Sequence, residues 1–254
     1  MVIIILFFTC LYTTINASLQ LKPIENIFLS SIPKSGTHLC TRLLGELVNK
    51  EAILYTDKLD PLPQASYYSA HQPYSYDLEQ QLRANNFRGI LIIRDPRDQI
   101  ISFIFFIYKY PNLWPDLTIL PFDQLFEYLV TDGSIATKSA IKGLDAYYRT
   151  FLLWKKVPDL FYVTRFEDLV GTQGGGSLKR QRQEIATIAQ HLQVPKTPEE
   201  TLYIGQAIFG RTWTFREGQI GSWKKYFTQY HKDIFKEHAG KLLIDMGYET
   251  DYNW

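Results

Sequence analysis

Cysteine and methionine are scarce in this chain, which has two of each among its 254 residues. The two cysteines, Cys10 and Cys40, cannot build a disulfide framework, and they lack the spacing of a zinc site. Neither sign of charge is in excess, because 27 lysines and arginines face 26 aspartates and glutamates. General nucleic-acid binders carry a strong basic excess, so we expect no nucleic acid as a partner, although one local basic pocket is compatible with this balance.

Heptad runs and internal repeats are also absent, which argues against a coiled coil or a solenoid. Hydrophobic residues make up 46% of the chain and aromatic residues 15%, and this content excludes a disordered protein. The length is ample for a large core. No break in composition divides the chain, so we predict a single domain over residues 22–254.

The first 17 residues form a segment of their own. Residues 1–15 (MVIIILFFTCLYTTI) are almost entirely apolar, a length that fits the core of a signal peptide better than a membrane-spanning helix of about 20 residues. No lysine or arginine precedes the run, and cleavage after Ala17 would leave Ile15 where a small residue is preferred. Three interpretations therefore stay open for residues 1–17: a signal or anchor, a mis-set start codon, or a buried apolar extension. A cytoplasmic protein is one expectation, and a secretory or membrane-associated protein, touching the membrane only through this segment, is the other.

Apolar runs alternate with helical patterns beyond this segment. Continuous apolar runs are typical of buried parallel strands, and helices between them favour a doubly wound, mostly parallel α/β sheet. The glycine-rich stretch at residues 171–176 (GTQGGG) predicts a flexible loop. The predicted strands are residues 27–31, 89–94 and 160–164, and the predicted helices are residues 37–49, 96–110, 123–130, 139–154 and 178–192.

The first candidate motif is the turn between the first predicted strand and its helix, residues 32–38 (IPKSGTH). A glycine-containing turn into a helix N-terminus presents backbone N–H groups and the positive end of the helix dipole to an anion. Lys34 adds a cation, and Ser35 and Thr37 add hydroxyl donors. The order differs from a Walker A loop, because the first glycine is missing and lysine precedes Gly36. An ordinary turn with a surface lysine is the alternative.

The second candidate motif places Arg94 at the end of a buried strand and Ser102 eight residues later on the next helix. A guanidinium and a hydroxyl can converge there on a second phosphate. The equal alternative is that Arg94 pairs with Asp95 or Asp98 while Ser102 only packs.

Together these residues resemble the sulfotransferases that use 3′-phosphoadenosine 5′-phosphosulfate (PAPS). Residues 33–37 match the P-K-S-G-T loop of that family, and Arg94 with Ser102 matches its element for the 3′-phosphate. Residues 216–224 (REGQIGSWK) are similar to its R-K-G-x-x-G-x-W-K signature. The segment at residues 70–73 (AHQP) stands where the family has T-H-x-P, and residues 166–168 (FED) are similar to its Y-E-D segment.

The resemblance implies a P-loop-like sulfotransferase fold and in-line transfer of a sulfuryl group from PAPS, the co-substrate, to a hydroxyl or amine acceptor, with no metal. It implies His71 as the general base and Lys34 as the residue that neutralises charge on the leaving oxygen. Four departures from the family pattern bear on donor affinity: Leu39, Ser69, Phe166 and Glu217. The donor-binding residues implied are Lys34, Ser35, Gly36, Thr37, His38, Arg94, Ser102, Arg216 and Gly218.

Two other functions remain as alternatives, a P-loop kinase or NTPase and a catalytically inactive nucleotide-binding protein. The acceptor stays open among sugars, lipids, phenols and protein tyrosines, and so does the oligomeric state. A run of aromatic residues is expected to pack in the core, with the wall of an acceptor pocket as the alternative. The run comprises Phe103, Phe105, Phe106, Tyr108, Tyr110 and Trp114.

Overall fold

The computed structural model describes residues 24, 26–63, 66–133, 141–210 and 216–254. The apolar segment at residues 1–17 lies outside these ranges, so its three interpretations stay predictions. None of the helices in the described ranges is long and apolar enough to cross a membrane.

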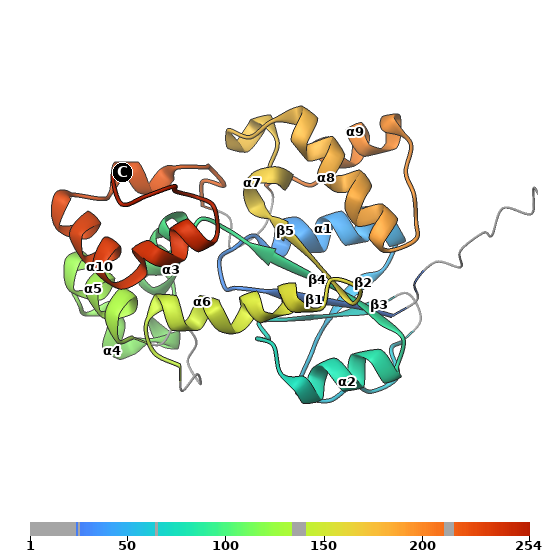
Figure 1. Cartoon of the computed structure of the whole chain (residues 1–254), viewed down its shortest axis with the longest axis horizontal. Coiled ribbons are helices and arrows are strands. Elements are labelled where there is room, and N and C mark those ends of the chain that lie inside the picture. The colour runs from blue at the N-terminus through green and yellow to red at the C-terminus, as the bar shows by residue number, and fades with distance from the viewer. Residues whose placement is uncertain (1–23, 25, 64–65, 134–140, 211–215) are drawn as a thin grey trace, which may run out of the picture.

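In the described part of the chain, five parallel strands form one sheet in the order β2-β3-β1-β4-β5 (Figure 1). The predicted parallel α/β sheet is thus confirmed, and so are the three strands expected from apolar runs. Two strands, β2 and β3, were not predicted. The strands are β1 (Asn26–Ser31), β2 (Glu51–Leu54), β3 (Ser66–Ala70), β4 (Phe87–Ile93) and β5 (Phe161–Arg165).

Helices cover both faces of the sheet, as a doubly wound fold requires (Figure 1). The predicted helix at residues 139–154 is shorter in the structure, where α6 begins at Leu144, and residues 134–140 lie outside the described ranges. Helices α2, α4, α7, α9 and α10 were not predicted. The helices are α1 (Thr37–Val48), α2 (Tyr76–Ala84), α3 (Pro96–Lys109), α4 (Pro115–Thr118), α5 (Phe122–Thr131), α6 (Leu144–Leu152), α7 (Phe166–Leu169), α8 (Leu178–His191), α9 (Pro198–Ala207) and α10 (Gln229–Asp245), with short 3₁₀ turns η1 (Pro111–Leu113), η2 (Leu153–Lys156), η3 (Thr172–Gly174) and η4 (Ser222–Lys225).

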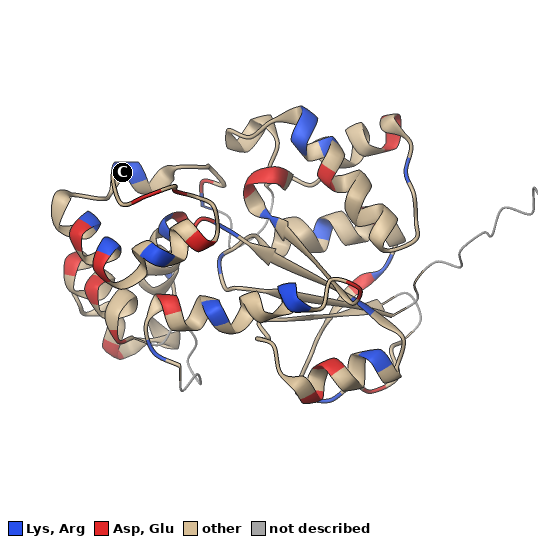
Figure 2. Cartoon of the chain, viewed as in Figure 1, with Lys and Arg blue, Asp and Glu red and all other residues tan. Residues whose placement is uncertain are grey.

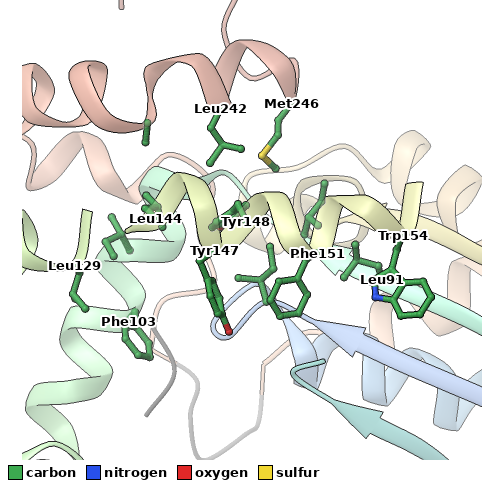
Figure 3. Close-up of a cluster of buried hydrophobic side chains, with 14 of the residues drawn as sticks. Leu91, Phe103, Leu129, Leu144, Tyr147, Tyr148, Phe151, Trp154, Leu242 and Met246 are labelled. Atoms are coloured by element: carbon green, nitrogen blue, oxygen red, sulfur yellow. The ribbon is translucent and has the colours of Figure 1, made fainter. Parts of the chain in front are cut away.

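The two faces of the sheet bury two separate cores, because alternate residues of a strand point to opposite sides. On β1, Ile27 and Leu29 pack with α1, α7, α8 and α9. Phe28 faces the other core, which includes α2, α3, α5, α6 and α10. Figure 3 shows part of this second core, where α6 contributes the fully buried Tyr148 and α10 contributes Leu242 beside it.

Local sequence accounts for the elements that carry the site. Asp95 caps α3 by accepting a hydrogen bond from the backbone N–H of Arg97 at 2.9 Å, and Pro96 takes the first helical position. Ser177 caps α8 in the same way, accepting from the N–H of Arg180. In a parallel sheet all strands end at one edge, and the loops that follow β1, β3, β4 and β5 therefore gather there.

Candidate active site

A cavity of about 500 Å³ opens at the carboxyl edge of the sheet. Its volume suits a small-molecule ligand, and its wall combines apolar side chains with a few cations. The lining residues are Pro33, Lys34, Gly36, Thr37, His38, Leu39, Leu54, Ser69, Ala70, His71, Arg94, Ser102, Phe103, Phe106, Trp114, Phe166, Val170, Ile208, Phe209, Gly210, Arg216, Glu217, Gly218 and Ser222.

The turn between β1 and α1 forms one wall of the cavity. Gly36 is the N-cap of α1 and has a φ of 106°, in the left-handed region that favours glycine. A Cβ at this position would also lie 2.8 Å from the Phe166 ring and 3.1 Å from Ile92. The amide of Gln99 on α3 donates to the carbonyl of Pro33 at 2.7 Å and anchors the turn. Glycine is therefore required here, because the backbone has a positive φ and because a Cβ would collide with the Phe166 ring.

Lys34 faces a concentration of positive charge. Its Nζ lies 4.0 Å from the centre of the Phe106 ring, over the electron-rich face. Burial lowers the pKa of Lys34 to about 8, and the positive charges of Arg94, Lys109 and Arg216 act in the same direction. Such a cluster of cations around one cavity favours an anionic ligand.

His71 follows β3 and is exposed to the cavity. Its Nδ1 lies 2.9 Å from the carbonyl oxygen of Ser31, which can only accept a hydrogen bond. Nδ1 therefore carries the proton, and Nε2 keeps its lone pair. Desolvation lowers the pKa of His71 below its usual value, helped by the charges of Lys34 and His38, although the Ser31 carbonyl opposes the shift. A neutral imidazole with a free Nε2 suits general-base chemistry.

Arg94 reaches the cavity from the end of β4. Its Nη2 donates to the carbonyl of Gln219 at 2.8 Å and lies 3.7 Å from Oδ2 of Asp98. Its guanidinium stacks 4.2 Å from the centre of the Phe166 ring. Its buried Nε has no hydrogen-bond partner among the described residues. Arg94 thus pairs with Asp98, as the alternative interpretation of the motif expected, while no described residue accepts a hydrogen bond from its Nε.

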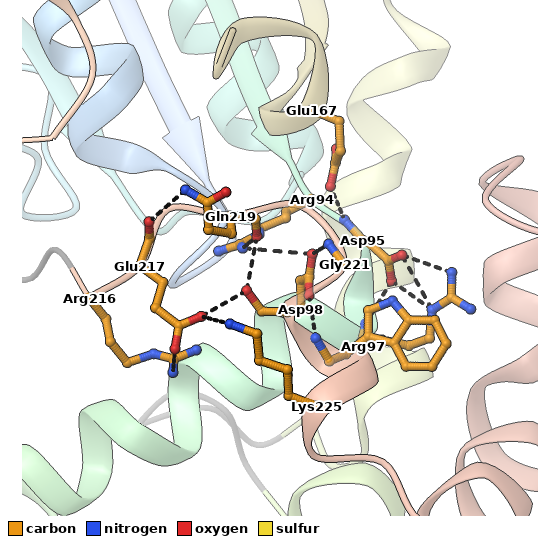
Figure 4. Close-up of polar contacts among 12 residues, drawn as sticks. Arg94, Asp95, Arg97, Asp98, Glu167, Arg216, Glu217, Gln219, Gly221 and Lys225 are labelled. Carbon is orange, nitrogen blue, oxygen red and sulfur yellow. Dashed lines mark hydrogen bonds and ion pairs between the residues drawn. The ribbon is translucent and has the colours of Figure 1, made fainter. Parts of the chain in front are cut away.

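Arg216 lines the same cavity as Arg94, and Figure 4 shows its contact with Glu217. Its Nη1 donates to Glu217 at 2.7 Å and to the hydroxyl of Tyr226 at 3.0 Å. The buried Nε of Arg216 also lacks a described partner. Neither Nε–H has an acceptor among the described residues, and a buried N–H without an acceptor costs stability. An anion in the cavity would bring acceptors beside both guanidinium groups.

The segment that carries Arg216 and Gly218 is held by residues far away in the sequence. The carboxylate of Asp98 accepts hydrogen bonds from the N–H groups of Gly221 at 2.7 Å and Trp223 at 2.8 Å (Figure 4). The carbonyl of Gly174 accepts from the N–H of Ile220 at 3.0 Å. Sequence reasoning offered Asp98 only as a partner of Arg94, because a contact over 125 residues leaves no local signal.

The glycine-rich stretch at residues 171–176 connects α7 with α8 as a loop, as predicted, and its flexibility stays a prediction. It contains the 3₁₀ turn η3 and packs closely against the segment around Gly218. A Cβ on Gly174 would lie 2.5 Å from the carbonyl oxygen of Gly218. Gly174 therefore allows these two backbone segments to approach each other closely.

The structure brings all the predicted site residues to the cavity wall except Ser35. The side chain of Ser35 is completely buried, and its backbone N–H donates to the carbonyl of Ile32 at 3.0 Å. Three members of the aromatic run, Phe103, Phe106 and Trp114, line the cavity, so both expectations for the run hold in part. No group of three or more metal-ligating side chains occurs within the described ranges.

The four departures from the family pattern also lie on the cavity wall: Leu39, Ser69, Phe166 and Glu217. Glu217 accepts from Arg216 and from the hydroxyl of Ser222 at 3.1 Å, and it pairs with Lys225 at 3.5 Å. A carboxylate thus stands beside one of the two arginines and balances part of its charge.

Comparisons with known proteins identify the family of this chain. The family model described as the sulfotransferase domain matches residues 53–247, which include His71, Arg94 and Ser102. The loop at residues 33–37 precedes that range. No curated protein sequence is significantly similar to this one.

Three solved structures share the fold. The mouse sulfotransferase SULT7A1, complexed with PAP, has a TM-score of 0.68 at 18% identity, with 88% of this chain and 86% of that chain covered. A retinol dehydratase in complex with androsterone and the inactive cofactor PAP has a TM-score of 0.64 at 15% identity, with 87% and 81% covered. The retinol dehydratase complex with retinol and PAP gives 0.61 at 16% identity, with 88% and 82% covered. Since the family model matches well over half of the chain, this protein belongs to the sulfotransferase domain family.

Proposed function

We propose that this protein transfers a sulfuryl group from PAPS to the hydroxyl of an apolar alcohol or phenol, with His71 as the general base. One observation carries the proposal. A single cavity brings together a cationic turn at a helix N-terminus, two arginines whose buried Nε atoms have no acceptor among the described residues, and an imidazole that is protonated on Nδ1.

The residues present fit PAPS. The turn from Lys34 to His38 would hold the phosphosulfate, because a helix N-terminus and a cation favour an anion. Arg94 and Arg216, with Ser102 and Gly218, would hold the 3′-phosphate. The two buried Nε atoms without described partners are the groups that this phosphate would satisfy. The three solved neighbours hold PAP in their own complexes, which supports the proposal.

PAPS supplies the sulfuryl group, and this chain supplies position and charge. Nε2 of His71 would take the proton from the acceptor hydroxyl as the new oxygen–sulfur bond forms. Lys34 would stabilise the negative charge left on the bridging oxygen when the old bond breaks. With a pKa of about 8, Lys34 is mostly protonated at pH 7, and the lowered pKa of His71 keeps its ring neutral there.

The cavity wall argues for an apolar acceptor. Leu54, Phe103, Phe106 and Trp114 contribute apolar surface to the cavity that His71 and Lys34 also line. Among the described lining residues Glu217 is the only acid. A sugar needs several polar partners, whereas a flat apolar body gains from aromatic contact. Among the solved neighbours, the retinol dehydratase binds retinol in one complex and androsterone in another.

The test is a transfer assay with radiolabelled PAPS and the full chain. The acceptors are an apolar alcohol, a phenol, a simple sugar and a tyrosine peptide. We expect label on the alcohol or phenol, and a loss of about 10² to 10⁴ in rate for His71→Gln. The matched control is His191→Gln, because His191 is partly buried, bonds the Gly89 carbonyl and is not among the cavity residues. Equal rates for the two variants, or turnover of magnesium ATP in place of PAPS, would overturn the proposal.

A further inference from the structure

Ser31, at the end of β1, contacts both the imidazole of His71 and the donor-binding turn. Its Oγ lies 3.0 Å from Nδ1 of His71 and 2.8 Å from Oγ1 of Thr37. Its carbonyl is the second acceptor for Nδ1, at 2.9 Å. The residue is completely buried. One serine therefore connects the base with the first residue of α1.

The direction of these hydrogen bonds follows from counting protons. Nδ1 of His71 carries a proton, because the Ser31 carbonyl can only accept. Toward Nδ1, the hydroxyl of Ser31 therefore acts as an acceptor. Its own proton can go to Thr37 at 2.8 Å, or to the carbonyl of Ala70 at the longer distance of 3.4 Å. When Ser31 donates to Thr37, the proton of the Thr37 hydroxyl is left for the cavity.

An anion in the cavity favours the arrangement in which Ser31 donates to Thr37 and Thr37 donates to the anion. Thr37 lines the cavity at the N-terminus of α1, and a phosphate or sulfate oxygen would accept the hydrogen bond of its hydroxyl. Donating strengthens a hydroxyl as an acceptor, so a chain of such bonds is polarised along its length. Ser31 then becomes a better acceptor for Nδ1–H, which stabilises the imidazolium that forms when Nε2 takes a proton.

We infer that Ser31 is a positioning residue that orients His71 and couples its basicity to occupancy of the donor anion site. This inference rests on the proposed function, since it assigns a further residue to the same site. Sequence reasoning missed Ser31 because the contact with His71 depends on the pairing of β1 with β3, in which Ser30 lies opposite Ala70.

The test is the titration of His71 in the full chain, followed by ¹⁵N NMR with and without adenosine 3′,5′-bisphosphate. Lys34 and His38 are the charged and titratable groups that act on this ring, and they are unchanged in the Ser31 variants. In Ser31→Ala we expect the pKa of His71 to fall by about half a unit to one unit, because the imidazolium loses an acceptor. The rise in pKa on adding the bisphosphate should be smaller than in the wild type. Ser31→Thr keeps a hydroxyl and should restore both values.

The matched control is Ser30→Ala on the same strand. Ser30 is also completely buried, but its hydroxyl donates to the carbonyl of Gln72 at 2.6 Å, whereas the hydrogen bonds of His71 Nδ1 go to Ser31. We expect Ser30→Ala to lose comparable stability and to keep the wild-type titration of His71. A Ser31→Ala protein that melts at a lower temperature with an unchanged His71 titration would overturn the inference. So would an equal change in Ser30→Ala.

Activity gives a second readout. Ser31→Ala should lower kcat about tenfold to a hundredfold, the range for a residue that orients a catalytic group, while the Kd of the bisphosphate changes less than about threefold. Failure of the proposed function would look different. In that case the wild type itself would not bind the bisphosphate, while the ligand-free titrations would still judge whether Ser31 sets the basicity of His71.

Discussion

The substitution Gly36→Ala tests the account of the turn between β1 and α1 most sharply. At a φ of 106° an alanine pays a backbone strain of about 1 to 2 kcal/mol. The new Cβ would also lie 2.8 Å from the Phe166 ring and 3.1 Å from Ile92, and overpacking of this kind costs about 1 to 3 kcal/mol. We therefore expect the free energy of unfolding to fall by about 2 to 5 kcal/mol.

Gly175→Ala is the matched control. Gly175 also has a positive φ, of 82°, but the nearest atom to its Cβ would be 3.8 Å away. Backbone strain without overpacking predicts a loss of about 1 to 2 kcal/mol. Urea unfolding measures both losses from the midpoints, provided the slopes agree. A loss in Gly36→Ala no larger than in Gly175→Ala would refute the argument that Phe166 closes over the turn.

Three further predictions concern charge. Burial raises the pKa of Glu167 to about 7, so its contribution to stability is full below pH 4.5 and is lost as pH rises through 7. In urea unfolding at pH 4.5 and 7.5, Glu167→Gln should reduce the loss of stability between the two pH values by about 1 to 3 kcal/mol. An unchanged pH profile would contradict this prediction. Asp98→Asn leaves the N–H of Gly221 or Trp223 without an acceptor. Calorimetry should therefore show that the variant binds the bisphosphate about tenfold or more weakly. Wild-type affinity would show that Asp98 does not hold the segment that carries Arg216 and Gly218. The affinity for the bisphosphate should fall as pH rises above 8, because Lys34 loses its proton there in the protein without ligand. Lys34→Gln should bind the bisphosphate more weakly at pH 7, and its affinity should change little up to pH 9. A parallel decline in affinity in both proteins would assign the effect to another group.

The sequence predicted those parts of the fold whose signals are local. The apolar run of β4, the cap at Asp95 and the proline after it each act within a few residues, and the structure has β4 and α3 as expected. Strand β3 was missed because its five residues, SYYSA, show neither an apolar run nor polar alternation. Its two tyrosines are buried only because neighbouring elements cover both faces of the strand.

The site residues also divide into those with a local signal in the sequence and those without one. Lys34 and Gly36 could be proposed from the turn itself, and His71 from a resemblance. The partners that hold them could not. Ser31 meets His71 across two paired strands, and Asp98 meets Trp223 over 125 residues, so both depend on the assembled sheet and its loops. The sequence therefore pointed to groups that act on a ligand more readily than to those that position them.

Binding of adenosine 3′,5′-bisphosphate and of AMP, measured by calorimetry without metal, tests the donor site most directly. The account predicts that the wild type binds the bisphosphate at least about a hundredfold more tightly than AMP, because the 3′-phosphate satisfies two buried guanidinium N–H groups. Arg94→Gln should abolish most of this preference. Arg97→Gln should keep it, since Arg97 is equally buried but bonds Asp95 and Glu249 and is not among the cavity residues. Equal binding of the two nucleotides, or no binding of either, would contradict the assignment of a PAPS site.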